Sequence, residues 1–250
     1  MKPVFKKTLT CLGIALAAVL PLASALAGDD GEENRDGDSF RRLSAQWWQW
    51  VHSIPPAQNP LLENSTDPVL SPSRCMVGQR GSVWFLAGNF GGTSNRVCTV
   101  PENVELFFPV INSNYFNSPG VCGDPATPLS VPELRDAIAP FINAATVVQA
   151  TLDGWPLHRH AIRRARSVVY ATTMPEDNIS DAPCIAAKLG QVPGGVYSPS
   201  VADGYYAKLD KLSVGRHTLI IDGVSPGSKP EFDFKLHVEY VLDVVPVRTR

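Results

Sequence analysis

Two histidines separated by one residue, His158 and His160, are the first feature of this sequence that could support chemistry. Residues 156–162 are predicted to form a strand, in which side chains two positions apart share a face, so both imidazoles could reach one metal ion. A zinc site needs three or four ligands, and the remaining candidates are Asp153, His217 and His237. Exposed polar residues of a strand explain the pair equally well, so the sequence does not favour a metal, and we expect no cofactor.

The same segment is rich in arginine. Arg159 and Arg163 are followed by Arg164 and Arg166, on a chain whose formal charge is −2. Such a basic stretch predicts binding of an anionic partner: a lipid headgroup, an acidic polysaccharide or an acidic segment of another copy. The alternative is an ordinary solvated strand face whose arginines pair with nearby carboxylates.

Three aromatic residues are candidates for stacking on a sugar ring. Trp155 follows the turn residues Asp153 and Gly154, Tyr205 follows a second Asp-Gly pair, and Trp48 lies at the flank of a tryptophan-rich helix. Exposed Trp and Tyr offer flat apolar faces with a polar edge, which suits carbohydrate. The alternative is that all three are buried in the core.

Nothing in the chain completes a catalytic motif. There is no G-x-S-x-G sequence, no glycine-rich phosphate loop between a strand and a helix, and no C-x-x-C pair. A formal charge of −2 gives no basic footprint for nucleic acid. The sequence therefore favours binding over catalysis and leaves both open.

The first residues read as a targeting signal. Lys2, Lys6 and Lys7 precede an apolar stretch that contains Pro21, and small residues at 25 and 27 suit cleavage after Ala27. We expect residues 1–27 to be a signal peptide, the protein to be secreted or periplasmic, and the mature chain to have no transmembrane segment. Removal of three lysines and no acids moves the charge from −2 to −5.

Four cysteines remain after that cleavage: Cys75, Cys98, Cys122 and Cys184. An even number in an exported chain predicts two disulfides. Three pairings exist, and we favour Cys75 with Cys98 and Cys122 with Cys184, because the nearer pair flanks a probable hairpin.

The rest of the chain is organised as one domain over residues 39–250, preceded by an acidic segment at 28–38 that we expect to be a disordered tether. A helix should begin at Asp38 or Ser39 and end before Pro55, with Phe40, Leu43, Trp47, Trp50, Val51 and Ile54 on one face. Ser130 to Glu133 matches a capping box, and the helix that it opens should end by Ala139.

Strands are expected at 82–87, 96–100, 104–111, 146–152, 156–162, 167–173, 205–209, 216–222 and 231–245, with long loops at 55–81, 112–129 and 174–200. The last strand alternates apolar and polar residues over its whole length. These patterns predict a mainly β fold: an antiparallel, jelly-roll-like β-sandwich with one or two short helices packed on it.

Several segments resemble a family of uncharacterised exported bacterial proteins. They are WWQWVHSIPPAQNPLLEN, CMVGQRGSVWFLAGNFGG and VPENVELFFPVINS, then ATLDG, MPEDN and VADGYYAKLDKLSVGRHTLIIDG. The resemblance covers most of the chain after residue 27 and implies a secreted, disulfide-bearing, β-rich protein. It supplies no activity and no site residues.

Three hypotheses follow. The protein is a secreted or periplasmic non-catalytic binding module for carbohydrate or another envelope component, with Trp48, Trp155, Tyr205, Arg159 and Arg163 as contacts. Alternatively it is a secreted hydrolase, assisted by a metal at His158 and His160. A third hypothesis is a cell-surface assembly protein, whose acidic tether and basic stretch link copies head to tail.

Overall fold

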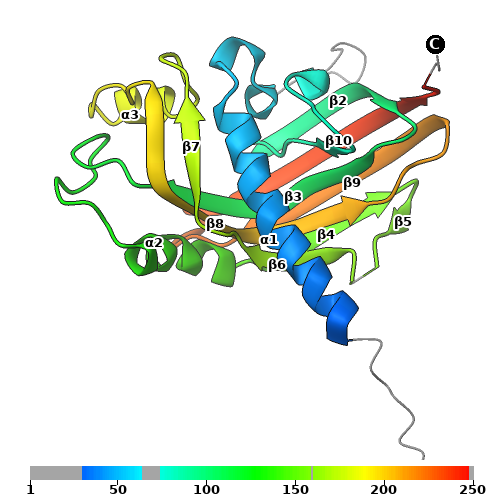
Figure 1. The fold of residues 1–250 in the computed structure, drawn as a ribbon, viewed down its shortest axis with the longest axis horizontal. Helices are drawn as coiled ribbons and strands as arrows, with labels where there is room; N and C mark the ends of the chain where they lie inside the picture. Colours follow the sequence, from blue (N-terminus) through cyan, green and yellow to red (C-terminus); the bar gives the residue numbers. More distant parts are fainter. Residues whose placement is uncertain (1–29, 64–73, 159, 248–250) are drawn as a thin grey trace, which may run out of the picture.

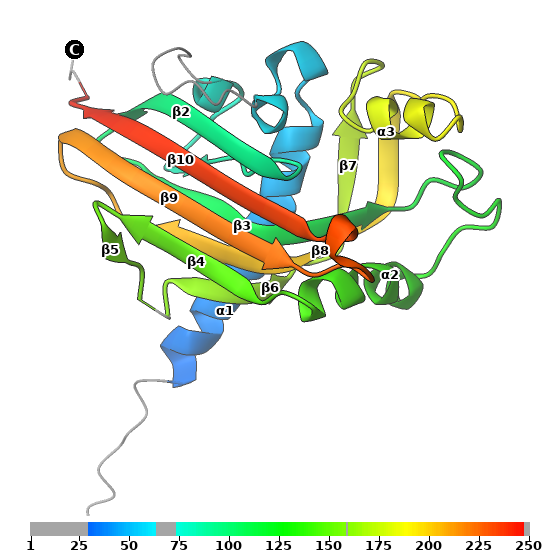
Figure 2. The ribbon, with the colours of Figure 1, turned by 180° about the vertical axis from the view of Figure 1, so that it is seen from behind.

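The computed structural model describes residues 30–63, 74–158 and 160–247, and it is mainly β, with two five-stranded sheets and three α-helices in these ranges. The expected signal peptide and Arg159 lie outside the described residues. Among the residues described, no helix combines the length and apolar character that a membrane span requires. The two sheets and the long first helix are seen from opposite sides in Figures 1 and 2.

Sheet A has the order β2-β10-β9-β4-β5. Its strands are β2 (Gly92–Pro101), β10 (Phe234–Val245), β9 (Gly215–Ser225), β4 (Val147–Leu152) and β5 (Trp155–Pro156). Sheet B has the order β1-β3-β8-β6, and β7 also pairs with β8. Its strands are β1 (Val83–Phe85), β3 (Glu105–Phe116), β8 (Gly195–Leu209), β6 (Ile162–Arg166) and β7 (Tyr170–Met174).

Both sheets are mixed, so the expected purely antiparallel sandwich is wrong. β1 runs parallel to β3, and β2 runs parallel to β10, whereas the other pairs are antiparallel. A parallel pair requires a crossover connection. The chain makes this connection by running from β1 in sheet B to β2 in sheet A and then back to β3 in sheet B.

The main core lies between the two sheets. The predicted alternation of the last strand is confirmed from Phe234 on: Leu236, Val238, Tyr240, Leu242 and Val244 are buried in a cluster that also contains residues of β3 and β8. The predicted start at 231 is wrong, because Phe232 lies in a 3-10 helix and is 65% exposed. The sheets approach closely at one point, where a Cβ on Gly223 would lie 2.6 Å from the carbonyl oxygen of Val110. Only glycine fits that position without a shift of the backbone.

The helix α1 (Asp30–His52) crosses the other face of sheet B, as Figure 1 shows, and forms a second core with it. All six residues predicted to face the core are buried. The helix begins at Asp30, upstream of the predicted N-cap. Glu32, Glu33 and Arg35 are good helix formers, so the sequence is compatible with this earlier start.

Two other local predictions are wrong for the same kind of reason. The helix α2 (Val131–Asn143) has the predicted capping box but continues through Pro140, because Leu134, Ile138 and Ile142 form one buried stripe. Residues 156–162 are not one strand, since β5 ends in sheet A and β6 begins in sheet B, and the segment between them crosses from one sheet to the other. Packing of distant elements overrides the local pattern in both cases.

The segment expected to be a loop at 174–200 contains the helix α3 (Asp181–Ala186) and the start of β8. The favoured disulfide pairing is confirmed: Cys75 pairs with Cys98, and Cys122 pairs with Cys184. The first bridge joins the 3-10 helix η3 (Arg74–Met76) to β2, and the second joins the segment after β3 to α3. Three further 3-10 helices are η1 (Pro56–Gln58), η2 (Pro60–Leu62) and η4 (Pro230–Phe232).

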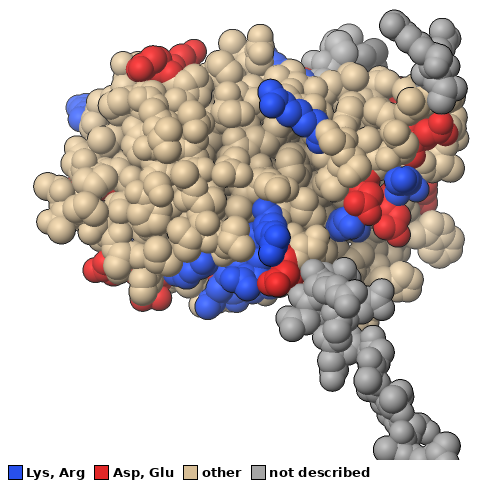
Figure 3. Space-filling view, viewed as in Figure 1, with Lys and Arg blue, Asp and Glu red and all other residues tan. Residues whose placement is uncertain are grey.

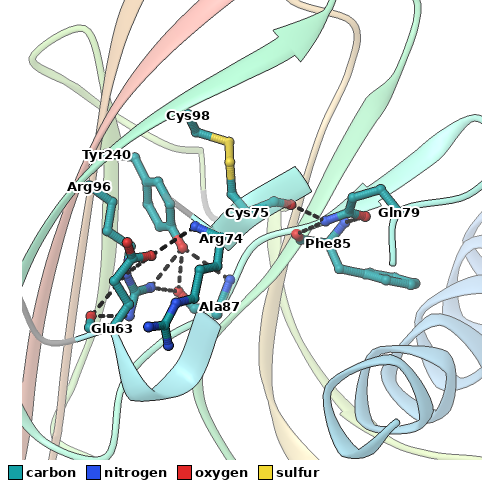
Figure 4. Close-up of a disulfide and its surroundings, with 9 residues drawn as sticks. All are labelled: Glu63, Arg74, Cys75, Gln79, Phe85, Ala87, Arg96, Cys98 and Tyr240. Carbon is teal, nitrogen blue, oxygen red and sulfur yellow. Dashed lines mark hydrogen bonds and ion pairs between the residues drawn. A yellow bond between two sulfur atoms is a disulfide. The ribbon is translucent and has the colours of Figure 1, made fainter. Parts of the chain in front are cut away.

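A buried arginine on β2 ties these parts together (Figure 4). The guanidinium of Arg96 is fully buried and donates to the backbone oxygens of Glu63 (3.0 Å), Ala87 (2.7 Å) and Gly88 (2.9 Å) and to the Tyr240 hydroxyl (2.7 Å). The carboxylate of Glu63 lies 4.0 Å away and provides the opposite charge. A buried charge is tolerated only with such complete pairing.

We predict that Arg96→Met lowers the free energy of unfolding by about 3–5 kcal/mol, because it removes the positive charge beside the buried Glu63 carboxylate and the donor to three backbone carbonyl groups. Urea unfolding with both disulfides intact measures this loss. The exposed Arg80 is the control, and Arg80→Met should change stability by less than about 0.5 kcal/mol. Equal stability of the two variants would contradict the structural role of Arg96.

Candidate functional site

The three aromatic residues expected to bind a ligand do not all line one cavity. Trp155, on β5, is 78% exposed. Tyr205, on β8, is half-buried and lines a hollow with Pro156, Leu157 and Ile162 between the two sheets. Trp48, on α1, is 6% exposed and packs on the opposite face of sheet B. They therefore do not form one site.

Arg163 lies on β6, which pairs with β8 beside Tyr205, whereas the two histidines lie outside the strands. His158 and His160 are exposed and lie in the crossover between β5 and β6, so they do not share a strand face. No group of three metal-ligating side chains gathers anywhere in the described ranges. Arg163 donates from Nε to the carbonyl of His160 (3.0 Å), and its guanidinium lies 5.8 Å from the centre of the Phe40 ring.

Trp48 instead lines an apolar cavity of about 580 Å³ between α1, β3 and α3, which we call the Trp48 cavity. Its other lining residues are His52, Leu62, Phe90, Asn114, Phe116, Cys122, Ile179, Ser180, Ala182, Pro183 and Cys184. The disulfide between Cys122 and Cys184 holds one wall in place. None of the lining residues is charged at neutral pH, and the face over β7 and α3 is largely free of charged side chains in Figure 3.

His52 is the polar member of the α1 wall. It is 2% exposed, and burial lowers its pKa to about 3, so the ring is neutral at physiological pH. Its Nδ1 shares a hydrogen bond with the hydroxyl of Thr172 (3.0 Å), and its ring packs against Trp48 and edge-on to Phe116. Its Nε2 has no hydrogen-bond partner among the described residues. A neutral imidazole can either donate or accept one hydrogen bond there.

Beneath the cavity lies a group of buried polar atoms without hydrogen-bond partners in the described structure: Trp48 Nε1, Asn112 Nδ2, Asn114 Nδ2, Tyr170 Oη and Tyr206 Oη. Tyr206 lies within interaction range of Asn112 and Trp48, and Tyr170 within range of Asn114, and these neighbours partly offset the effect of burial on the tyrosine pKa values, although none of the pairs has full hydrogen-bond geometry. Burial raises the pKa of both tyrosines, so their hydroxyls stay protonated. Each unpaired group costs about 1–3 kcal/mol.

The other tryptophans of α1 show that this lack of pairing is local. Trp47 donates from Nε1 to the carbonyl of Leu86 (2.9 Å), and Trp50 donates to the carbonyl of Val77 (2.8 Å). Buried polar groups that lack partners in a folded protein call for an explanation such as a bound molecule. Two of these groups, on Trp48 and Asn114, belong to residues that line the Trp48 cavity, which makes it the candidate site.

Sequence reasoning missed most of this site. His52 follows Trp48 by four residues, which places both on one helix face, and Asn112 and Asn114 alternate as strand residues on one face do. These spacings were available in the sequence. The approach of α3 to α1 was not, because it depends on the path of the chain after β7.

A second arrangement resembles a serine hydrolase triad but has a different chemistry. His217 Nδ1 lies 2.8 Å from a carboxylate oxygen of Asp153, and Nε2 lies 3.3 Å from the Ser213 hydroxyl. Nε2 is also 2.9 Å from the carbonyl oxygen of Ser213, which can only accept. Both ring nitrogens therefore donate, the ring cannot take a proton from the serine, and the cluster pins the turn after β4 to the start of β9.

With this geometry in hand, comparison with known proteins adds no relative: no family model, no curated protein and no solved structure matches the chain. The resemblance to exported bacterial proteins therefore stays a prediction.

We predict that Tyr206→Phe raises the free energy of unfolding by about 1–3 kcal/mol, because it removes a buried hydroxyl whose desolvation no hydrogen bond offsets. Tyr240→Phe is the matched variant. The hydroxyl of Tyr240 accepts from Arg96 (2.7 Å) and donates to the carbonyl of Ala87 (2.8 Å), so its loss should cost about 1–3 kcal/mol. Chemical denaturation compares the two, and an equal loss in both would contradict the unpaired state of Tyr206.

A pH-dependent stability follows from the His217 cluster. Its hydrogen bond with Asp153 raises the pKa of His217 and lowers the pKa of Asp153. The histidine stabilises the fold below its unfolded pKa of about 6.5 and loses that effect as the pH rises through its folded value, whereas the carboxylate stabilises above about 3.9. The stability lost on His217→Gln should thus be larger near pH ~5.5 than near pH ~8.5, and His158→Gln should show no such difference. A loss independent of pH would contradict the charged pair.

Proposed function

We propose that this protein is an exported, non-catalytic binding protein whose ligand occupies the Trp48 cavity. The observation that carries the proposal is the coincidence of an apolar cavity of about 580 Å³ with unpaired buried polar groups around it. Small-molecule sites are typically concave, mainly apolar and lined by a few polar groups that orient the ligand.

The lining residues define the ligand chemically. Trp48, Phe90 and Phe116 provide aromatic walls, and Phe90 is 56% exposed at the rim. The neutral His52 and the amide of Asn114 provide hydrogen bonds but no charge. A charged group buried there would lack a counterion. The ligand that fits is a small, uncharged, mainly apolar molecule with an oxygen that accepts a hydrogen bond from Asn114.

Export is the part of the proposal that depends on the sequence of the first residues. Two disulfides are compatible with an oxidising compartment. We therefore propose cleavage after Ala27 and a secreted or periplasmic protein.

The other functional expectations have less support. A carbohydrate bound by Trp48, Trp155 and Tyr205 stays a prediction, because these residues do not share a site. The metal-assisted hydrolase was expected from a strand that would bring His158 and His160 together, and these residues do not lie in a strand. Head-to-tail assembly stays a prediction.

Binding of the neutral fluorescent probe N-phenyl-1-naphthylamine tests the proposal. Ala182 lines the cavity on α3, whereas Ala186, on the same helix, does not line it, and both are exposed. We predict that the native protein binds the probe, that Ala182→Phe weakens binding by about tenfold or more by filling the cavity, and that Ala186→Phe has no effect. Absence of binding by the native protein, or equal effects of the two variants, would contradict the proposal.

Displacement of the same probe tests the chemistry of the ligand. Because the cavity holds no cation, 1-decanol should displace the probe at least about tenfold better than decanoate at neutral pH. Stronger displacement by decanoate would show that the site binds acids.

A further inference from the structure

A second cavity, of about 680 Å³, lies where α1, α2 and β6 meet. We call it the arginine cleft. It is lined by Arg41, Arg135, Arg164 and Arg166, with Gly37, Asp38 and Ala165. It shares no lining residue with the Trp48 cavity. In Figure 3, Lys and Arg side chains gather along the lower edge of the molecule, near the lower end of α1.

The carboxylates of the cleft do not balance its arginines. Asp203 is 2% exposed and accepts two hydrogen bonds from Arg164 (3.0 and 2.7 Å), with Arg166 Nε 3.4 Å away. Asp38 lies 3.3 Å from Arg41 at the surface. Among the side chains that the structure describes, four guanidinium groups therefore face two carboxylates, and one of these is already held by a bidentate pair.

Arg135 shows the effect of this excess positive charge. Its Nη2 donates to the carbonyl of Ser167 (2.8 Å), but its buried Nη1 has no partner in the described structure. Burial lowers its pKa, and repulsion from Arg166 and Arg41 lowers it further. Asp203 opposes this shift only in part, and since Arg164 already holds that carboxylate, a further anion would stabilise the group of arginines.

Arg166 leaves donors available for such an anion. Its side chain is 60% exposed, and only its Nε approaches a carboxylate in the described structure. The backbone oxygen of Arg166 accepts from Arg41 Nε (3.2 Å), which keeps the two residues together. The terminal nitrogens of a guanidinium match two oxygens of one phosphate group.

We propose that the arginine cleft binds a phosphate-bearing ligand, with Arg41, Arg135 and Arg166 as its contacts and Arg164 as the residue that holds Asp203. A phosphate monoester carries a charge of about −1.5 to −2 at neutral pH, which matches an excess of two positive charges, whereas a carboxylate supplies only one negative charge. This site is independent of the Trp48 cavity and of the function proposed for it.

Calorimetric titration of the disulfide-bonded protein with pyrophosphate, at constant ionic strength, tests the proposal. Pyrophosphate should bind at least about tenfold more tightly than acetate, and Arg166→Gln and Arg41→Gln should each weaken it by about tenfold, the loss expected for one charge-assisted hydrogen bond. The matched control is Arg42→Gln, the exposed neighbour of Arg41 that does not line the cleft. It makes the same change of charge and should have no more than a small effect.

A second arm distinguishes a soluble phosphate from a lipid headgroup. Phosphatidylcholine vesicles with and without phosphatidic acid are sedimented with the protein, in the presence and absence of pyrophosphate. Binding to phosphatidic acid vesicles that pyrophosphate and Arg166→Gln both abolish supports a lipid phosphate, and pyrophosphate binding without vesicle binding supports a soluble one. No binding in either arm, or an equal loss in Arg42→Gln, would overturn the proposal.

Discussion

The buried charge of Arg96 is the constraint on which much of this fold depends. A guanidinium without solvent needs every donor satisfied, and its partners are backbone oxygens of Glu63, Ala87 and Gly88 together with the hydroxyl of Tyr240. These groups belong to the segment after α1, the segment after β1 and the last strand. Their positions are therefore set together, and the disulfide between Cys75 and Cys98 closes the same region.

The helix α1 packs across sheet B next to the Arg96 cluster. Two indoles of the helix bind carbonyl groups on the Arg96 side, through Trp47 and Trp50. The third, on Trp48, faces the opposite way, towards Tyr206 and the cavity, and finds no partner in the described residues. One helix therefore carries indoles that are fully paired, on Trp47 and Trp50, and one that is not, on Trp48, where we propose that a ligand binds. Binding there would recover hydrogen bonds that folding left unmade.

The two cavities differ in what their polar side chains lack. The Trp48 cavity lacks hydrogen-bond partners but has no excess charge, whereas the arginine cleft has an excess of positive charge around Arg135. Sheet B connects them, because Tyr206 and Asp203 are near neighbours on β8. The same strand thus lies beside both proposed sites, one for a neutral ligand and one for an anion.

Periodic and local features could be predicted from the sequence alone. These include the buried face of α1, the alternation of β10, the capping box at Ser130 and the disulfide pairing, since each depends on residues close in sequence or on a short list of combinations. Tertiary structure decided the rest. The parallel pairs, the crossover that separates His158 from His160, and the meeting of Arg41, Arg135 and Arg166 all join segments far apart in the chain. Neither hydrophobic period nor motif spacing encodes such contacts, because they depend on how whole elements pack.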